Sequence, residues 1–180
     1  MSAIARRLVL ARSLAAGAAL IAFRPLRAVA AKPAPRSLAF LNTHTGERVR
    51  CEYWCDGDYV ADALREVDHV LRDHRSGDVI AIDPRLLDLL HAIRQRLDTP
   101  AAFEVISGYR SPATNAALAA QGRGVATRSL HTQGKAIDIR LPGRDLATLR
   151  AAALELAGGG VGYYPRSNFV HMDTGRVRAW

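Results

Sequence analysis

One stretch of the chain combines metal-ligating side chains with a turn that leads into a strand, and it constrains the fold more than any other. Residues 129–138 read Ser-Leu-His-Thr-Gln-Gly-Lys-Ala-Ile-Asp, and residues 169–173 read Phe-Val-His-Met-Asp. His131, Asp138 and His171 thus supply two imidazoles and one carboxylate, on segments that we interpret as neighbouring strands. Three such ligands bind Zn²⁺ and leave its fourth position open for water, which is the arrangement of a catalytic zinc site.

The pattern around Asp138 predicts the side of the sheet on which its carboxylate lies. Gly134 lets the backbone turn before a strand that we expect at residues 136–141. Because side chains alternate along a strand, Asp138 faces away from the isoleucines on either side of it. His171 lies among apolar residues, where a lone histidine is more often simply buried than bound to a metal.

The residues around these ligands resemble a known family. Ser129, His131, Gly134, Ala136 and Asp138 occupy every fixed position of the Ser-x-His-x-x-Gly-x-Ala-x-Asp motif of the zinc D-Ala-D-Ala peptidases. The likeness extends through Ser-Gly-Tyr-Arg-Ser-Pro-Ala-Thr-Asn at 107–115, Gly-Gly-Val-Gly-Tyr-Tyr-Pro at 159–165 and Phe-Val-His-Met-Asp-Thr-Gly at 169–175, to Trp180. Together these segments resemble the MepK-type murein endopeptidases, a branch of that superfamily, over residues 38–180.

This resemblance implies a zinc-dependent hydrolase of amide bonds in peptidoglycan. It implies one Zn²⁺ per chain, held by His131, Asp138 and His171, with stem peptides or their cross-links as the substrate. It favours an endopeptidase that cleaves cross-links over a D,D-carboxypeptidase or dipeptidase. The alternative from another class is a catalytically silent, zinc-containing module that binds the cell wall and lacks an effective base.

Three further residues are candidates for catalysis and substrate binding. The D-Ala-D-Ala dipeptidases place a glutamate three residues before the last histidine ligand, where this chain has Asn168. Asp173 lies two residues beyond His171 and faces the same way on a strand, so we expect it to be the general base or, alternatively, to cap the following turn. The family carries an arginine at the place of Arg110, which we expect to bind a substrate carboxylate or the oxyanion. Ser129 is expected to orient the adjacent histidine ligand or to donate to substrate.

The positive charge of the chain is concentrated at its N-terminus. The formal charge is +8 over 180 residues, and five of the 25 Lys and Arg residues lie within the first thirty positions, which hold no acidic residue. The rest of the chain has twenty basic and seventeen acidic residues and is only slightly basic. We therefore expect no nucleic-acid partner.

Residues 1–30 have the three parts of an export signal. Arg6 and Arg7 are followed by an apolar run from Ser13 to Phe23 and by the small-residue triplet at 28–30. The eleven residues of this run are too few for a membrane-spanning helix, which needs about 20, so we expect no stable transmembrane anchor in the mature form. The arginine pair resembles a twin-arginine signal. The expected location is the periplasm or cell envelope.

Beyond the signal we expect a linker at residues 31–37 and one zinc peptidase domain at residues 38–180. Apolar periodicity and breaker residues predict helices at 59–73, from 83 to before 98, at 112–120 and at 145–157. They predict strands at 38–41, 48–54, 103–107, 136–141, 161–163 and 168–173. Without a regular βαβ repeat, this order indicates an α+β fold, with an antiparallel sheet that carries the zinc site and with flanking helices.

An exported chain permits a disulfide between its two cysteines, Cys51 and Cys55. Residues four apart on a regular strand are about 13 Å from each other, which is beyond disulfide reach. We therefore expect either two free thiols or a bridge across a local bend, with no catalytic role.

Overall fold

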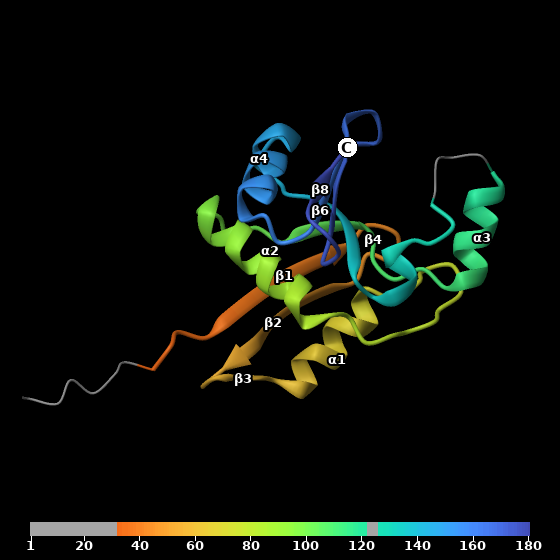
Figure 1. The fold of residues 1–180 in the computed structure, drawn as a ribbon. Coiled ribbons are helices and arrows are strands. Elements are labelled where there is room, and N and C mark those ends of the chain that lie inside the picture. Colours follow the sequence, from red (N-terminus) through yellow and green to blue (C-terminus); the bar gives the residue numbers. More distant parts are fainter. Residues whose placement is uncertain (1–31, 122–125) are drawn as a thin grey trace, which may run out of the picture. The chain divides into compact units, whose positions relative to one another are not determined.

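The computed structural model describes residues 32–121 and 126–180. The predicted export signal and the first linker residue lie outside this part of the chain. The described residues form one α+β unit around an eight-stranded sheet (Figure 1). The strands are β1 (Arg36–Asn42), β2 (Arg48–Cys55), β3 (Asp58–Tyr59), β4 (Phe103–Ser107), β5 (Ala136–Arg140), β6 (Gly160–Tyr164), β7 (Phe169–Asp173) and β8 (Arg178–Ala179). The α-helices are α1 (Ala61–Val70), α2 (Pro84–Arg96), α3 (Pro112–Ala120) and α4 (Leu146–Leu156).

The sheet is mostly antiparallel, as predicted. Its strand order is β3-β2-β1-β4-β5-β7-β6-β8. Strands β5, β7 and β6, which carry the predicted site, are antiparallel to their neighbours in this group. The pairs β1–β4 and β6–β8 are parallel, which the sequence did not predict.

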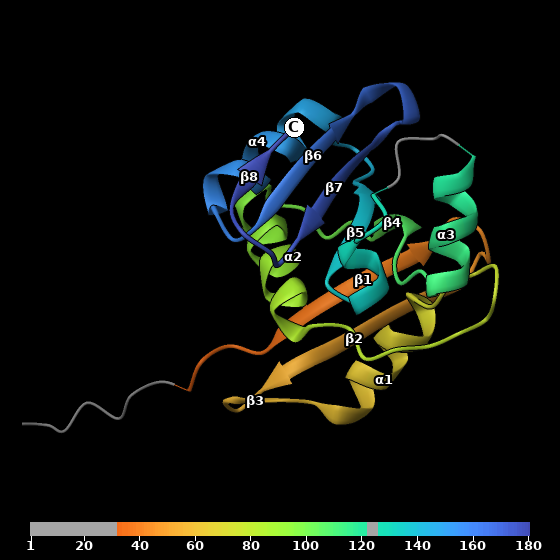
Figure 2. The same ribbon diagram turned by 45° about the vertical axis from the view of Figure 1, so that its right-hand side comes forward.

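Helices α2, α3 and α4 begin after a residue whose side chain caps them. Asp83 precedes α2 and accepts a hydrogen bond from the backbone N–H of Arg85, while Pro84 occupies the first turn. Asp145 caps α4 in the same way by accepting from the backbone N–H of Thr148. Helices α2 and α4 lie side by side against the sheet (Figures 1 and 2).

The aliphatic core supports the strands of the site from one face. The alternate residues of β5, β7 and β6 that point away from the predicted ligands are buried with the apolar stripes of α2 and α4. These residues are Ile137, Ile139, Val161, Val170 and Met172. Asp138 and His171 therefore lie on the opposite face of the sheet, as the alternation predicted.

The largest differences from the prediction concern β1, α1 and two short strands. Strand β1 begins at Arg36, inside the predicted linker, because Arg36 pairs with Trp54 of β2 and its guanidinium forms an ion pair with Asp88 at 2.7 Å. Helix α1 is shorter than predicted at both ends, because Tyr59 joins the sheet in β3 and the chain leaves the helix after Val70. Strands β3 and β8 were not predicted.

The two cysteines are free thiols, with Cys51 buried. They lie on β2, whose extended backbone separates them. Within the described ranges, every helix is too short or too polar to cross a lipid bilayer.

Candidate metal centre and its cleft

Two of the three predicted ligands are cross-strand neighbours. Asp138 of β5 stands directly opposite His171 of β7, and His171 stands opposite Gly162 of β6. These three residues form one row across the sheet, on the face away from the aliphatic core. The register therefore brings together two ligands that are far apart in the sequence.

The third ligand, His131, lies on a short 3₁₀ turn (Leu130–Gln133) that precedes β5. The hydroxyl of Ser129 accepts the backbone N–H of His131 at 3.3 Å and caps this turn. Gly134 ends the turn with φ at +66°, and a Cβ there would lie 2.5 Å from the carbonyl oxygen of Ala81. Only glycine fits this turn without strain, and the turn places the His131 ring beside β5.

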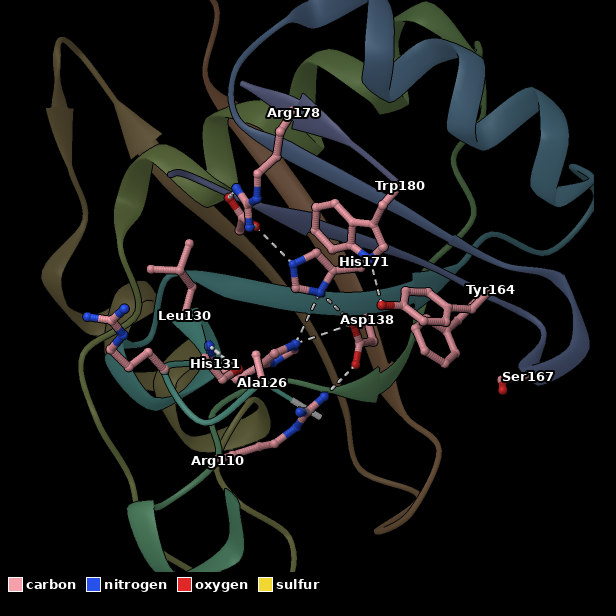
Figure 3. Close-up of a pocket in the computed structure, with 14 residues that line it drawn as sticks. Arg110, Ala126, Leu130, His131, Asp138, Tyr164, Ser167, His171, Arg178 and Trp180 are labelled. Atoms are coloured by element: carbon pink, nitrogen blue, oxygen red, sulfur yellow. Dashed lines mark hydrogen bonds and ion pairs between the residues drawn. The ribbon is translucent and has the colours of Figure 1, made fainter. Parts of the chain in front are cut away.

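The three predicted ligands converge on one point. Nε2 of His131 lies 3.2 Å from Nδ1 of His171 and 3.3 Å from Oδ1 of Asp138, and the last two atoms are 2.8 Å apart (Figure 3). Ligand atoms bound at about 2.0–2.1 Å around a tetrahedral zinc lie roughly 3.3 Å from each other. All three residues are buried, and this arrangement is consistent with a metal site.

Each ligand is fixed on its other side by a separate partner. Nδ1–H of His131 donates to the carbonyl oxygen of Gly108 at 2.6 Å, and Nε2–H of His171 donates to Oδ2 of Asp173 at 3.0 Å. Both imidazoles thereby present their unprotonated nitrogen to the common point. Such partners orient metal ligands and set the tautomer of each histidine.

Asp138 is fixed in the same way by Arg110. Nη2 of Arg110 donates to Oδ2 of Asp138 at 2.7 Å, while Nε donates to the hydroxyl of Ser107 at 2.9 Å. Oδ1 of Asp138 is left to face the histidines. Burial alone would raise the pKa of Asp138. Without a metal ion the imidazoles can carry protons on the nitrogens that face Asp138, and their charges and hydrogen bonds hold its pKa below the usual range.

The carboxylate of Asp173 is fully buried, with both oxygens engaged. It accepts hydrogen bonds from the backbone N–H groups of Gly160 and Gly175 at 3.0 and 2.9 Å, and from Arg178 at 3.0 and 2.6 Å. Burial alone would raise the pKa of Asp173, but the hydrogen bonds from His171, from Arg178 and from the backbone outweigh it and hold the pKa below its usual range.

The role of general base expected for Asp173 stays a prediction, and the structure shows what its carboxylate contacts. Its carboxylate does face the same way as His171, but it meets Nε2, on the side of the ring opposite to the ligand atom Nδ1. The alternative expectation, a cap of the following turn, agrees with the hydrogen bond from Gly175. The spacing in the sequence identified the face of the strand and left open which ring nitrogen each carboxylate would meet.

A cleft of about 460 Å³ opens over the ligands. Its described lining includes all the predicted site residues. The other eight lining residues were given no role, and they include Arg128, Tyr164, Arg178 and Trp180. Tyr164 and Trp180 fall within segments quoted for the family resemblance, so the motif itself was the available signal. Their position became visible only with the pairing of β6 and β8.

The comparisons with known proteins agree with this site. A family model described as "Peptidoglycan L,D-endopeptidase MepK" matches residues 30–180. The peptidoglycan L,D-endopeptidase MepK of Escherichia coli strain K12 is 43% identical over 175 residues, which cover 97% of this chain and 96% of the relative. The probable peptidoglycan L,D-endopeptidase MepK of Haemophilus influenzae is 44% identical over 154 residues, 85% of this chain and 83% of the relative. The likeness that the motif indicated is thereby confirmed, and the chain belongs to the MepK family of peptidoglycan L,D-endopeptidases.

Proposed function

We propose that this chain is a zinc-dependent endopeptidase that hydrolyses L,D peptide cross-links of peptidoglycan. The observation that supports the metal is the convergence of His131 Nε2, Asp138 Oδ1 and His171 Nδ1, within 2.8 to 3.3 Å of one another. Two nitrogen ligands and one oxygen ligand with an open fourth position suit a catalytic Zn²⁺, one per chain. When bound, zinc supplies a Lewis acid that polarises the peptide carbonyl and lowers the pKa of water to about 7.

The chain's own residues hold and orient the reacting groups. We assign Asp173 to positioning His171, because its carboxylate accepts a hydrogen bond from Nε2–H of His171 and is anchored by Arg178. We assign Arg110 to positioning Asp138. Arg110 also lines the cleft, so its guanidinium is placed to meet a substrate carboxylate or the developing oxyanion.

Ser129 acts through the turn that carries His131. Its hydroxyl accepts the backbone N–H of His131, and its carbonyl oxygen accepts the hydroxyl of Thr132 at 2.7 Å. Two roles were expected for Ser129, and these contacts support the first of them, the orientation of His131. A donation to substrate remains part of the proposal, since Ser129 also lines the cleft.

One observation favours the alternative, a wall-binding module without turnover. The described lining of the cleft holds only two carboxylates, and both are engaged: Asp138 with Arg110 and the histidines, and Asp173 with His171 and Arg178. A module of this kind would bind zinc and peptidoglycan and release no product.

Turnover distinguishes the two functions. We would incubate residues 31–180 with purified cross-linked muropeptides and follow the products by chromatography and mass spectrometry. An endopeptidase yields uncross-linked peptides, loses activity to a chelator and regains it with Zn²⁺, while His131→Ala stays inactive. Binding to intact sacculi without product release would instead support the silent module.

The location follows from the substrate, because a peptidoglycan enzyme works in the cell envelope. We propose that residues 1–30 direct export by the twin-arginine route and that the mature chain begins near Ala31. Replacing Arg6 and Arg7 by lysine should retain the protein in the cytoplasm. N-terminal sequencing of the exported protein would identify the cleavage position.

A further inference from the structure

An aromatic residue extends the row that carries the metal ligands. The last strand, β8, lies parallel to β6, and Trp180 exchanges backbone hydrogen bonds with Val161 and Tyr163, so it stands beside Gly162. A Cβ at Gly162 would lie 2.8 Å from the indole ring. Because glycine leaves this space open, the indole leans over β6 and approaches His171, with ring centroids 5.2 Å apart.

Tyr164 lies next to this indole on the same face. It is two residues beyond Gly162 on β6, and its ring stacks on that of Phe169 with centroids 4.6 Å apart. Its hydroxyl is 2.7 Å from Nε1 of Trp180. The Tyr164 side chain is thus held at two points, by the stack on one side and by the indole at its tip.

The hydrogen bond from Trp180 determines whether the Tyr164 hydroxyl acts as a donor or an acceptor toward other groups. An indole nitrogen is only a donor, so the oxygen of Tyr164 accepts this hydrogen bond and keeps its own proton for another acceptor. In the described part of the chain, no residue accepts that proton. Figure 3 shows the hydroxyl of Tyr164 and the indole nitrogen of Trp180 facing each other beside His171, at the cleft that both residues line.

We propose that the hydroxyl of Tyr164 donates a hydrogen bond to the oxygen of the scissile peptide carbonyl, and that Trp180 fixes this donor in place. This proposal rests on the proposed peptidase function. The hydrogen bond strengthens as the carbonyl oxygen gains negative charge, so it stabilises the transition state more than the bound substrate. Tyr164 is therefore a catalytic residue, and Trp180 is a positioning residue that acts through it.

The first test compares Tyr164→Phe with the wild type in their zinc-loaded forms. The variant keeps the stack on Phe169 and loses only the hydroxyl. We expect kcat to fall by about 10²-fold with little change in KM and with an unchanged zinc content, as for the loss of one oxyanion donor. The matched control is Tyr163→Phe, because Tyr163 is the next residue of β6, points to the other face and contacts Arg150. It should keep the wild-type kcat.

The second test asks whether Trp180 acts through Tyr164. Trp180→Phe keeps an aromatic ring and removes the N–H donor. We expect a smaller loss of kcat than for Tyr164→Phe, and no further loss when the two substitutions are combined. Independent, multiplying effects would refute the role assigned to Trp180.

A binding measurement separates this proposal from a general loss of activity. Calorimetry with a phosphinate analogue of the scissile dipeptide should show weaker binding to Tyr164→Phe, since its tetrahedral oxygens mimic the transition state. An active wild type together with a Tyr164→Phe variant of unchanged kcat and inhibitor affinity would overturn the proposal for Tyr164. An inactive wild type in the same assay would instead overturn the proposed function.

Discussion

Nε2–H of His171 donates a hydrogen bond to Oδ2 of Asp173 at 3.0 Å, so the imidazole presents Nδ1, and not Nε2, to the other two ligands. A histidine that offers Nδ1 to this point has its ring turned relative to one that offers Nε2, as His131 does. The carboxylate behind the ring therefore determines which nitrogen is available.

The first prediction concerns this carboxylate. Asp173→Asn should lower zinc affinity by about 10- to 100-fold, because the amide holds the tautomer of His171 less firmly and leaves Arg178 without its charge partner. Competition with a chromophoric chelator measures the affinity. Asp145→Asn is the matched control, since Asp145 caps α4 outside the cleft and asparagine caps equally well. Full zinc affinity combined with a large loss of kcat would return Asp173 to the role of general base.

The second prediction concerns the ligands themselves. The purified wild type should contain one zinc ion per chain, whereas His131→Ala and His171→Ala should contain almost none, because two remaining ligands do not hold the ion. Elemental analysis after dialysis measures the content. The exposed His44, which lies outside this group, provides the control variant His44→Ala with unchanged zinc. Undiminished zinc in both ligand variants would remove these residues from the site.

The third prediction concerns the turn below His131. Gly134→Ala should destabilise the protein by clearly more than 1 kcal/mol, because it combines the strain of a positive φ with the close approach to the carbonyl of Ala81. Gly143→Ala is the matched control. Gly143 also has a positive φ, at +79°, but a Cβ added there would have no atom within 4 Å. It should lose only about 1 kcal/mol, the usual strain of the left-handed conformation. Denaturant unfolding measures both, and equal losses would contradict the role of the close approach.

The fourth prediction concerns acid stability. Burial alone would raise the pKa of Asp73, but hydrogen bonds from Thr114 and from the backbone of Ser111 and Arg75 hold it at about 2. The ionised carboxylate therefore stabilises the fold above its unfolded pKa of about 4, and this contribution is lost as the pH falls from about 4 through 2. The Asp73→Asn variant lacks this contribution at every pH. The difference in unfolding free energy between wild type and variant should therefore shrink as the pH falls from about 4 to 2.

Asp68 provides the control for acid stability, because its contribution to stability changes with pH in the opposite direction. Burial raises the pKa of Asp68 above its usual range, despite the backbone N–H of Ile82 that it accepts. Protonation of Asp68 therefore favours the folded state, and its contribution increases as the pH falls. A pH-independent difference for Asp73→Asn would contradict the assigned cause.

Local patterns predicted most of the helices and strands because each is encoded in a short run of residues. The caps at Asp83 and Asp145 and the alternation around Asp138 are of this kind. The three candidate metal ligands could also be identified from the sequence, because the motif fixes their types and spacing. Strand β8 is only two residues long, Arg178–Ala179, and owes its existence to pairing with β6, which no local pattern reveals.

The surroundings of the ligands depended on the same long-range pairing. Trp180 reaches His171 only because the strand order places β8 beside β6 and because Gly162 leaves space between them. The side of His171 on which Asp173 lies depends on a rotation of the ring, and residue spacing along a strand carries no information about it. The sequence therefore indicated the convergence of the three candidate ligands better than the identity of their partners.

Strand β8 lies at an edge of the sheet, and two functions depend on it at once. Arg178 anchors the carboxylate behind His171, and Trp180 holds the hydroxyl of Tyr164. Edge segments of this length separate from a sheet far more often than the whole domain unfolds. When β8 detaches, the support of the metal ligand and the placement of the tyrosine are lost together. We therefore expect the fraying of this short strand to limit the share of molecules that are competent for reaction. Amide hydrogen exchange at Tyr163 and Trp180, whose N–H groups make the pairing bonds, would report this fraying directly.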